Sequence, residues 1–235
     1  MINKGQENKF SNSLKTSAKI SIIYCASYSP PKIDHLSRAF SGNVETLLRY
    51  LSLIKVKIDS FIYFSTSKLN EENILQSDKH ISNKYYYLSK LLAENVLFDK
   101  SYLFNKLLIL RCPTIFGKDK KKSNLTNLVN SYMNNQPVII PGDQKLFNAC
   151  TSVTDLFLIC QKAINRRDYW TKIFEIGASN KTSIYCLLKK INKKNVINIR
   201  MSKALKTAKL LETKKISSFL NVGLSSIGKI IRCRI

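Results

Sequence analysis

Three short apolar runs, separated by segments with helical periodicity, constrain the fold of this chain more than any other feature. The runs are continuous rather than alternating, which is typical of strands buried on both faces of a sheet. They are "KISIIYCAS" (19–27), "SFIYFSTS" (60–67) and "KLLILRCP" (106–113), with helical patterns at 43–55 and from 83 to about 99. Strands and helices in this alternation predict an α/β fold with a doubly wound parallel sheet.

The remainder of the chain is more mixed and predicts a small annex on that sheet. We expect a polar tail at 1–18, a partial Rossmann-type domain at 19–136, and an α+β annex at 137–235 that interleaves with the last sheet strands. Further elements are expected as helices near 124–135, from Asp155 and at 183–191, as strands at 172–179 and 196–200, and as weaker helical stretches towards the end.

The charge is strongly positive, with 39 Lys and Arg against 15 Asp and Glu and a formal net charge of +24. Such an excess raises the hypothesis of a nucleic-acid partner. The lysines recur along the whole chain, however, and only Lys118 to Lys122 form a dense run. A dispersed charge favours a general composition over a binding face. The charge pattern therefore disfavours a nucleic-acid partner.

Cysteine and histidine usage indicates a reduced protein without a metal site. The six cysteines stand singly, with no C-x-x-C pair, and the two histidines have no clustered ligands beside them. No signal-peptide pattern leads the chain, and no apolar stretch reaches the roughly 18–20 residues that span a bilayer. We expect a cytoplasmic protein that has no membrane partner.

A tyrosine four residues before a lysine is the pattern with the most chemical content. The sequence contains this spacing four times, at Tyr28/Lys32, Tyr86/Lys90, Tyr102/Lys106 and Tyr185/Lys189. Spacing alone therefore selects none of them. Tyr86 and Lys90 differ from the others because they lie within a convincing helix, where residues four apart share a face. They also follow a strand that ends in "STS" (65–67).

The strand end and the helix together predict a proton-transfer site. In parallel α/β sheets, ligands gather at the carboxyl ends of the strands. A Ser or Thr hydroxyl there can bind a substrate oxygen while the Tyr86 phenol moves a proton to or from it. An ammonium such as that of Lys90 stabilises a tyrosinate and lowers the pKa of a phenol from its usual value of about 10.

These residues resemble the extended short-chain dehydrogenase/reductases, in particular the NAD-dependent sugar-nucleotide epimerase/dehydratase group. The resemblance is carried by a series of motifs in order, from about residue 20 to residue 231. They are "SIIYCAS" (21–27), Asn43 in "GNVETLL", "FIYFSTS" (61–67), "YYLSKLLAE" (86–94), "LRCPTIFG" (110–117), "PGDQKLFNACTSVTDL" (141–156), "IFEIGAS" (173–179) and "RMSKALKTAKLL" (200–211).

The resemblance implies a role for each matching residue. Tyr86 would be the general acid/base, Lys90 would hold the cofactor ribose and tune Tyr86, and Thr66 would orient the substrate oxygen. The reaction would oxidise a sugar carbon transiently with bound NAD or NADP and then return the hydride. The implied cofactor contacts are Ala26, Ser27, Asn43, Tyr86, Lys90 and Pro113, and the implied substrate contacts in the site and the annex are Ser67 and Asn148.

One element of the family pattern is missing. A glycine-rich turn should approach the cofactor pyrophosphate, yet the first forty residues hold a single glycine, Gly5. We therefore expect an N-terminally truncated member that lacks the cofactor-binding half and binds NAD weakly or not at all. The strand at 21–27 would then have an open edge, which we expect a second copy or a partner chain to cover.

Two alternatives stay open beside the enzyme. The first is a non-catalytic remnant or interaction subunit of such an enzyme, which predicts co-purification with a partner chain. The second is a basic nucleic-acid-binding module. The latter predicts lysines gathered on one face and strongly salt-dependent binding.

Overall fold

The computed structural model describes residues 19–28, 36–69, 81–117, 124–142, 145–191, 199–202 and 210–232. The chain divides into two compact units. The first comprises Met1–Arg111 and Cys160–Phe174, and the second comprises Cys112–Ile159 and Glu175–Ile235. The chain therefore leaves the first unit, returns to it for one segment, and leaves it again.

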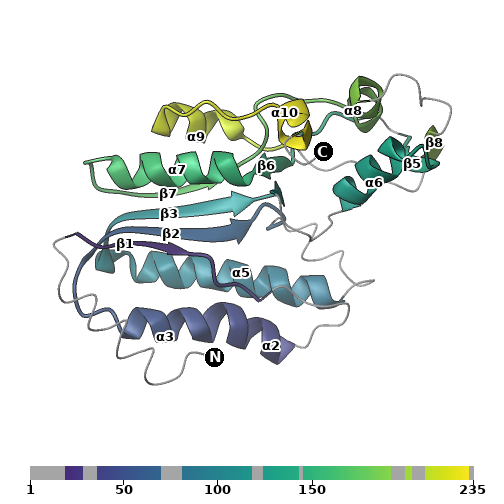
Figure 1. Ribbon diagram of the computed structural model, residues 1–235. Coiled ribbons are helices and arrows are strands. Elements are labelled where there is room, and N and C mark those ends of the chain that lie inside the picture. Colours follow the sequence, from purple (N-terminus) through teal and green to yellow (C-terminus); the bar gives the residue numbers. More distant parts are fainter. Residues whose placement is uncertain are drawn as a thin grey trace. The chain divides into compact units, whose positions relative to one another are not determined.

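The first unit is built on a four-stranded sheet in the order β1-β2-β3-β7 (Figure 1). Its strands are β1 (Ser21–Tyr24), β2 (Ile58–Thr66), β3 (Phe104–Cys112) and β7 (Trp170–Glu175). β1 pairs with β2 in parallel, with Ser21 opposite Ser60 and Tyr24 opposite Tyr63. The predicted α/β class with parallel-strand sheets is confirmed, because the continuous apolar runs form neighbouring strands.

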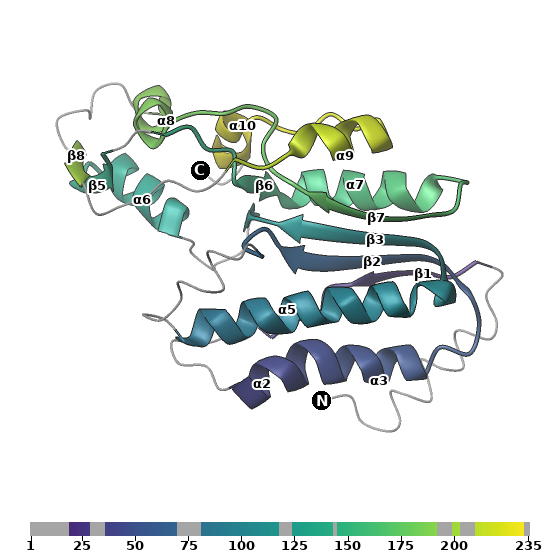
Figure 2. The same ribbon diagram turned by 180° about the vertical axis from the view of Figure 1, so that it is seen from behind.

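Helices on one side of this sheet complete the first unit (Figures 1 and 2). They are α2 (Leu36–Phe40), the π-helical turn η1 (Ser41–Glu45), α3 (Thr46–Ser52) and α5 (Ile81–Asp99), and a short 3-10 turn, η3 (Ser101–Leu103), leads into β3. Fully buried side chains from both layers, including Leu47, Ile58 and Leu97, form one apolar core. The helix expected to begin at Asn43 begins earlier, at Leu36.

β1 is the outermost strand of the described sheet. Ile23 of this strand is 45% exposed, whereas the side chain of Tyr24 is buried against the aromatic residues of β2. An outer strand with an exposed apolar side chain can accept a further strand. That a second copy or a partner chain covers this edge stays a prediction.

The second unit combines two small sheets with short helices. β4 (Thr114–Phe116) pairs in parallel with β6 (Cys150–Ser152), and β5 (Val138–Pro141) pairs in parallel with β8 (Ile199–Ser202). The helices are α6 (Asn124–Met133), α8 (Ile184–Ile191), α9 (Thr213–Leu220) and α10 (Ile227–Arg232), and α7 (Val153–Asn165) contains the boundary between the units. Buried residues from these elements, including Tyr132, Ile140 and Leu188, form a second core.

One expected helix differs from the structure. The motif at 200–211 resembles a terminal helix of the family and so predicts a helix, but residues 200–202 belong to strand β8. The β-branched and long apolar side chains of "IRMS" pair with the apolar strand β5, which favours the extended conformation. Residues 203–209 lie outside the described part of the chain.

Candidate active site

Helix α5 carries the tyrosines and the lysine that the sequence singles out. Tyr86 is half-buried, Tyr87 is buried, and their ring centroids lie 5.7 Å apart. Lys90 is only 1% exposed, although a lysine on a helix surface normally extends into water. A buried ammonium needs hydrogen-bond acceptors, so the surroundings of Lys90 define the site.

The ammonium of Lys90 is held by the carboxyl-terminal part of β2. Its Nζ donates to the carbonyl oxygen of Phe64 at 2.8 Å and to the hydroxyl of Tyr63 at 3.3 Å. It also lies 4.7 Å from the centroid of the Tyr63 ring, within the range of a cation–π contact. These contacts fix the middle of α5 against the end of β2, as expected for this pair of elements.

Asn43 connects the segment after β1 to the same turn of α5. Its Nδ2 donates to the Ser89 hydroxyl at 2.9 Å, and Ser89 in turn donates to the carbonyl oxygen of Tyr86 at 2.8 Å. Its Oδ1 accepts from the Tyr28 amide at 2.9 Å and from the Ser27 hydroxyl at 3.2 Å. Asn43 lies in the π-helical turn η1, a distortion that often marks functional positions.

The hydroxyl groups at the end of β2 differ in their surroundings. Thr66 is 8% exposed, and its Oγ1 accepts from the Lys68 amide at a long 3.4 Å. Ser67 follows in a half-buried turn. Ser65 is buried, and its Oγ has no hydrogen-bond partner among the described residues. Residues two apart in a strand share a face, so Ser65 lies on the face of Tyr63 that meets Lys90.

The structure therefore joins several of the predicted residues within the first unit. Ser27 donates to Asn43, and Asn43 is connected through Ser89 to the turn of Tyr86. Lys90 donates to the carbonyl oxygen of Phe64, two residues before Thr66. Ala26, beside Ser27, is exposed at the end of β1. Their catalytic and cofactor-binding roles stay predictions.

Pro113 and Asn148 belong to the second unit. Pro113 is half-buried between β3 and β4. Asn148 is 3% exposed, and its amide group donates to the Leu211 carbonyl at 3.0 Å and accepts from the Leu211 amide at 2.8 Å. Gly177 approaches so closely that a Cβ there would lie 2.7 Å from the Asn148 carbonyl oxygen. Asn148 thus ties three segments of this unit together, and its expected contact with substrate stays a prediction.

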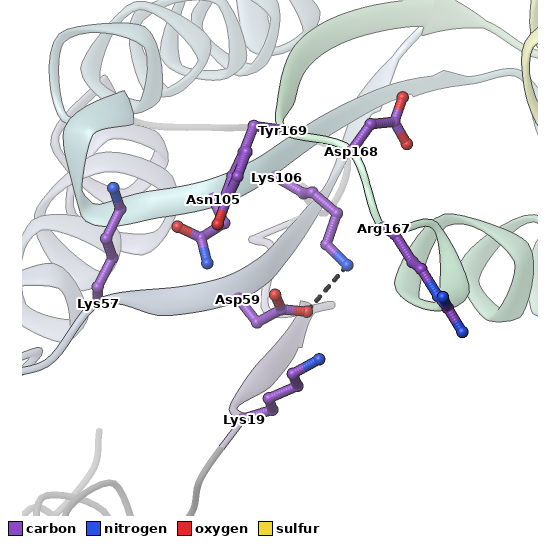
Figure 3. Close-up of a pocket in the computed structure, with 8 residues that line it drawn as sticks. All are labelled: Lys19, Lys57, Asp59, Asn105, Lys106, Arg167, Asp168 and Tyr169. Carbon is purple, nitrogen blue, oxygen red and sulfur yellow. Dashed lines mark ion pairs between the residues drawn. The ribbon is translucent and has the colours of Figure 1, made fainter.

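Lys106, from another Tyr-x-x-x-Lys pair, lies near the opposite ends of the strands. Its Nζ is 2.9 Å from the Asp59 carboxylate and donates to the carbonyl oxygens of Ile164 and Arg166 at 2.8 Å each. It therefore bridges β2 to the carboxyl end of α7, where helical carbonyls lack partners. A polar cavity of about 220 Å³ surrounds this ion pair (Figure 3).

Sequence reasoning missed two residues of the site. Ser89 lies three residues after Tyr86, so its helical spacing places it on the same face and was an available signal. Tyr63 reads as one more aromatic residue of a buried strand, and nothing in the local sequence shows that its hydroxyl meets Lys90.

Two further properties bear on the range of functions. In the ranges that the structure describes, no three or more His, Cys, Asp or Glu side chains are grouped in a way that could hold a metal ion. None of the helices in those ranges is long and apolar enough to cross a membrane.

No protein-family model and no curated protein sequence matches this chain. Solved structures do match its fold. UDP-glucuronic acid 4-epimerase from Bacillus cereus, in complex with UDP-glucuronic acid and NAD, aligns with a TM-score of 0.69 at 19% identity over 95% of this chain and 76% of that chain. UDP-N-acetylglucosamine 4-epimerase from Bacillus cereus aligns with a TM-score of 0.70 at 15% identity, over 98% of this chain and 80% of that chain.

ADP-L-glycero-D-manno-heptose-6-epimerase from Helicobacter pylori gives a TM-score of 0.71 at 16% identity, over 98% of this chain and 75% of that chain. Sequence identities this low establish a shared fold and not a shared activity. The chain therefore shares the fold of these epimerases.

Proposed function

We propose that this chain is an NAD(P)-dependent sugar-nucleotide epimerase/dehydratase-type protein whose chemistry resides in Tyr86, Lys90 and Thr66. The observation that carries the proposal is the buried ammonium of Lys90, one helical turn after Tyr86 and bonded to the end of β2. Support also comes from the fold, which is shared with epimerases whose structures contain NAD and sugar nucleotides.

Each residue has a distinct part in the proposed chemistry. The Tyr86 phenolate takes the proton from a sugar hydroxyl as the attached carbon is oxidised, and the phenol so formed returns that proton in the reverse step. Lys90 stabilises the phenolate form of Tyr86 that acts as the base, and its ammonium donates to a ribose hydroxyl. Thr66 hydrogen-bonds the reacting sugar oxygen and keeps it close to the phenol. A bound NAD or NADP would supply the chemistry of hydride acceptance and return.

The residues of the first unit fit one end of such a cofactor. The Lys90 ammonium, the exposed segment after β1 and the buried Ser65 hydroxyl offer donors and acceptors for a ribose and a nicotinamide. In the part of the chain that the structure describes, this hydroxyl has no hydrogen-bond partner. Pyrophosphate binding requires close backbone approach, which glycines permit. Within the described residues of this unit the only glycine is Gly42, where a Cβ would lie 2.4 Å from the Cβ of Tyr28, so it allows η1 to approach the segment after β1.

We accordingly predict that the isolated protein binds NAD and NADP in the millimolar range. Lys90 is the proposed ribose contact, whereas the described residues of the first unit hold no glycine-rich turn for the pyrophosphate. A thousandfold weaker dissociation constant corresponds to about 4 kcal/mol of lost binding free energy. Isothermal titration calorimetry with each nucleotide measures this directly. A micromolar dissociation constant would show that a phosphate site exists elsewhere in the chain.

A further inference from the structure

The buried ammonium of Lys90 has an unusual partner in Tyr63. Two neutral oxygens, the Phe64 carbonyl and the Tyr63 hydroxyl, accept its protons at 2.8 and 3.3 Å. The face of the Tyr63 ring lies 4.7 Å away and adds a cation–π contact. Tyr63 thus contacts the ammonium through both its hydroxyl and its ring.

Tyr63 is itself held rigidly and stays uncharged. It is 1% exposed, and its ring stacks on Tyr24 with the ring centroids 5.9 Å apart. Burial raises the pKa of the Tyr63 phenol far above its ordinary value, and the neighbouring Tyr24, Tyr86 and Glu94 add to that increase. The hydroxyl therefore remains neutral throughout the physiological range.

A neutral partner has a specific consequence for a catalytic lysine. A carboxylate bonded to Lys90 would cancel most of the positive charge that is needed beside a tyrosinate. The nearby carboxylate on α5, that of Glu94, is instead paired with Arg111 at 2.6 Å. The Tyr63 hydroxyl and ring contact the buried ammonium without adding a negative charge beside it.

We propose that Tyr63 is a positioning residue of the candidate site, which holds the Lys90 ammonium at the end of β2 while preserving its charge. The importance of Tyr63 for catalysis rests on the proposed function. The contact that it invokes, however, is a property of the folded chain and can be measured without substrate or cofactor.

The test uses the ammonium groups as reporters. Buried, hydrogen-bonded lysine ammonium protons exchange slowly with water, and exposed ones exchange too fast to be seen. A ¹H–¹⁵N spectrum of protein labelled with ¹⁵N-lysine should therefore show Lys90 and Lys106, the two lysines that are buried among the described residues. Lys90→Met assigns the first signal by its disappearance.

Tyr63→Phe keeps the ring and removes the hydroxyl, so we expect the Lys90 protons to exchange about tenfold faster or to vanish from the spectrum. The Lys106 signal should persist, because its acceptors are the Asp59 carboxylate and the carbonyls of Ile164 and Arg166, none of which the substitution alters. Tyr50→Phe alters the same aromatic cluster next to Tyr24 and should leave both signals unchanged.

The outcomes separate the possible explanations. Loss of the Lys106 signal together with that of Lys90 would show a misfolded variant, and Tyr63→Trp, which also lacks the hydroxyl but retains an aromatic face, would then be used in the same way. An unchanged Lys90 exchange rate in a folded Tyr63→Phe protein would overturn the proposal. Nucleotide binding enters none of these measurements, so a failure of the proposed function would appear separately, in the calorimetric titration.

Discussion

Replacing Tyr86 with phenylalanine is expected to lower the rate of sugar-nucleotide conversion by about 10²–10⁴-fold, the usual contribution of a positioned acid/base. The substitution removes the phenolic proton and preserves the ring, which packs against Tyr87. Conversion of UDP-glucuronic acid and UDP-N-acetylglucosamine at millimolar NAD, followed by chromatography of the sugar nucleotides, measures the effect. Thermal unfolding of the variant should be nearly unchanged.

Tyr85→Phe provides the matched control for this substitution. Tyr85 is the preceding residue of the same helix and is also half-buried, but the residue four positions later is Ser89 rather than a lysine. We expect this variant to convert the sugar nucleotides at the wild-type rate. Equal rates in Tyr85→Phe and Tyr86→Phe would assign the proton transfer to another group.

Replacing Lys106 with methionine is expected to reduce the free energy of unfolding by about 3 kcal/mol, because one partner of a largely buried ion pair is removed. The side chains of Lys106 and Asp59 are 5% and 20% exposed, and the carbonyls of Ile164 and Arg166 would also lose their donor. In a chain of this size such a loss lowers the melting temperature by roughly 6–12 °C.

The same ion pair predicts a dependence of stability on pH. Burial raises the pKa of Asp59, but hydrogen bonds from Lys106, Ser60 and Asn105 and the charge of Lys106 outweigh it and lower the pKa below its ordinary value of 3.8. The folded pKa is therefore lower than the unfolded one. The stabilisation is fully present above the unfolded value and is lost as the pH falls through the folded value.

Urea unfolding at pH 7 and at pH 3 measures both effects. The difference in the free energy of unfolding between wild type and Lys106→Met should be larger at pH 7 than at pH 3. Lys57→Met, which removes an exposed lysine lining the same cavity, should unfold like the wild type (Figure 3). A Lys106→Met protein as stable as this control would mean that the ion pair contributes nothing to folding.

The arrangement of strands and helices could be predicted because it depends on local periodicity. The apolar runs around Ile22, Ile62 and Ile109 form neighbouring strands, since a continuous run can be buried only inside a helix-covered sheet. Tyr86 and Lys90 could be chosen among four equivalent pairs for a similar reason. Their helix and the preceding hydroxyl-bearing strand were both visible in the sequence.

Other features depend on contacts between residues distant in sequence. The bond from Lys90 to Tyr63 joins residues 27 positions apart, and that from Lys106 to Arg166 joins residues 60 apart. No local pattern encodes either one. The π-helical turn at Asn43 was read as ordinary helix, because one inserted residue changes the hydrogen bonding without changing the composition. Asn148 likewise gave no sign of its bonds to Leu211.

The most direct test of the proposed site is the response of the Lys90 ammonium signal to nucleotide. Titration of ¹⁵N-lysine-labelled protein with millimolar NAD or NADP should shift or broaden the Lys90 signal, because the ribose is proposed to bind that ammonium. The Lys106 signal near the other ends of the strands should stay fixed. If neither nucleotide changes the Lys90 signal at millimolar concentrations, or if only Lys106 responds, Tyr86 and Lys90 are not part of a nucleotide-dependent active site.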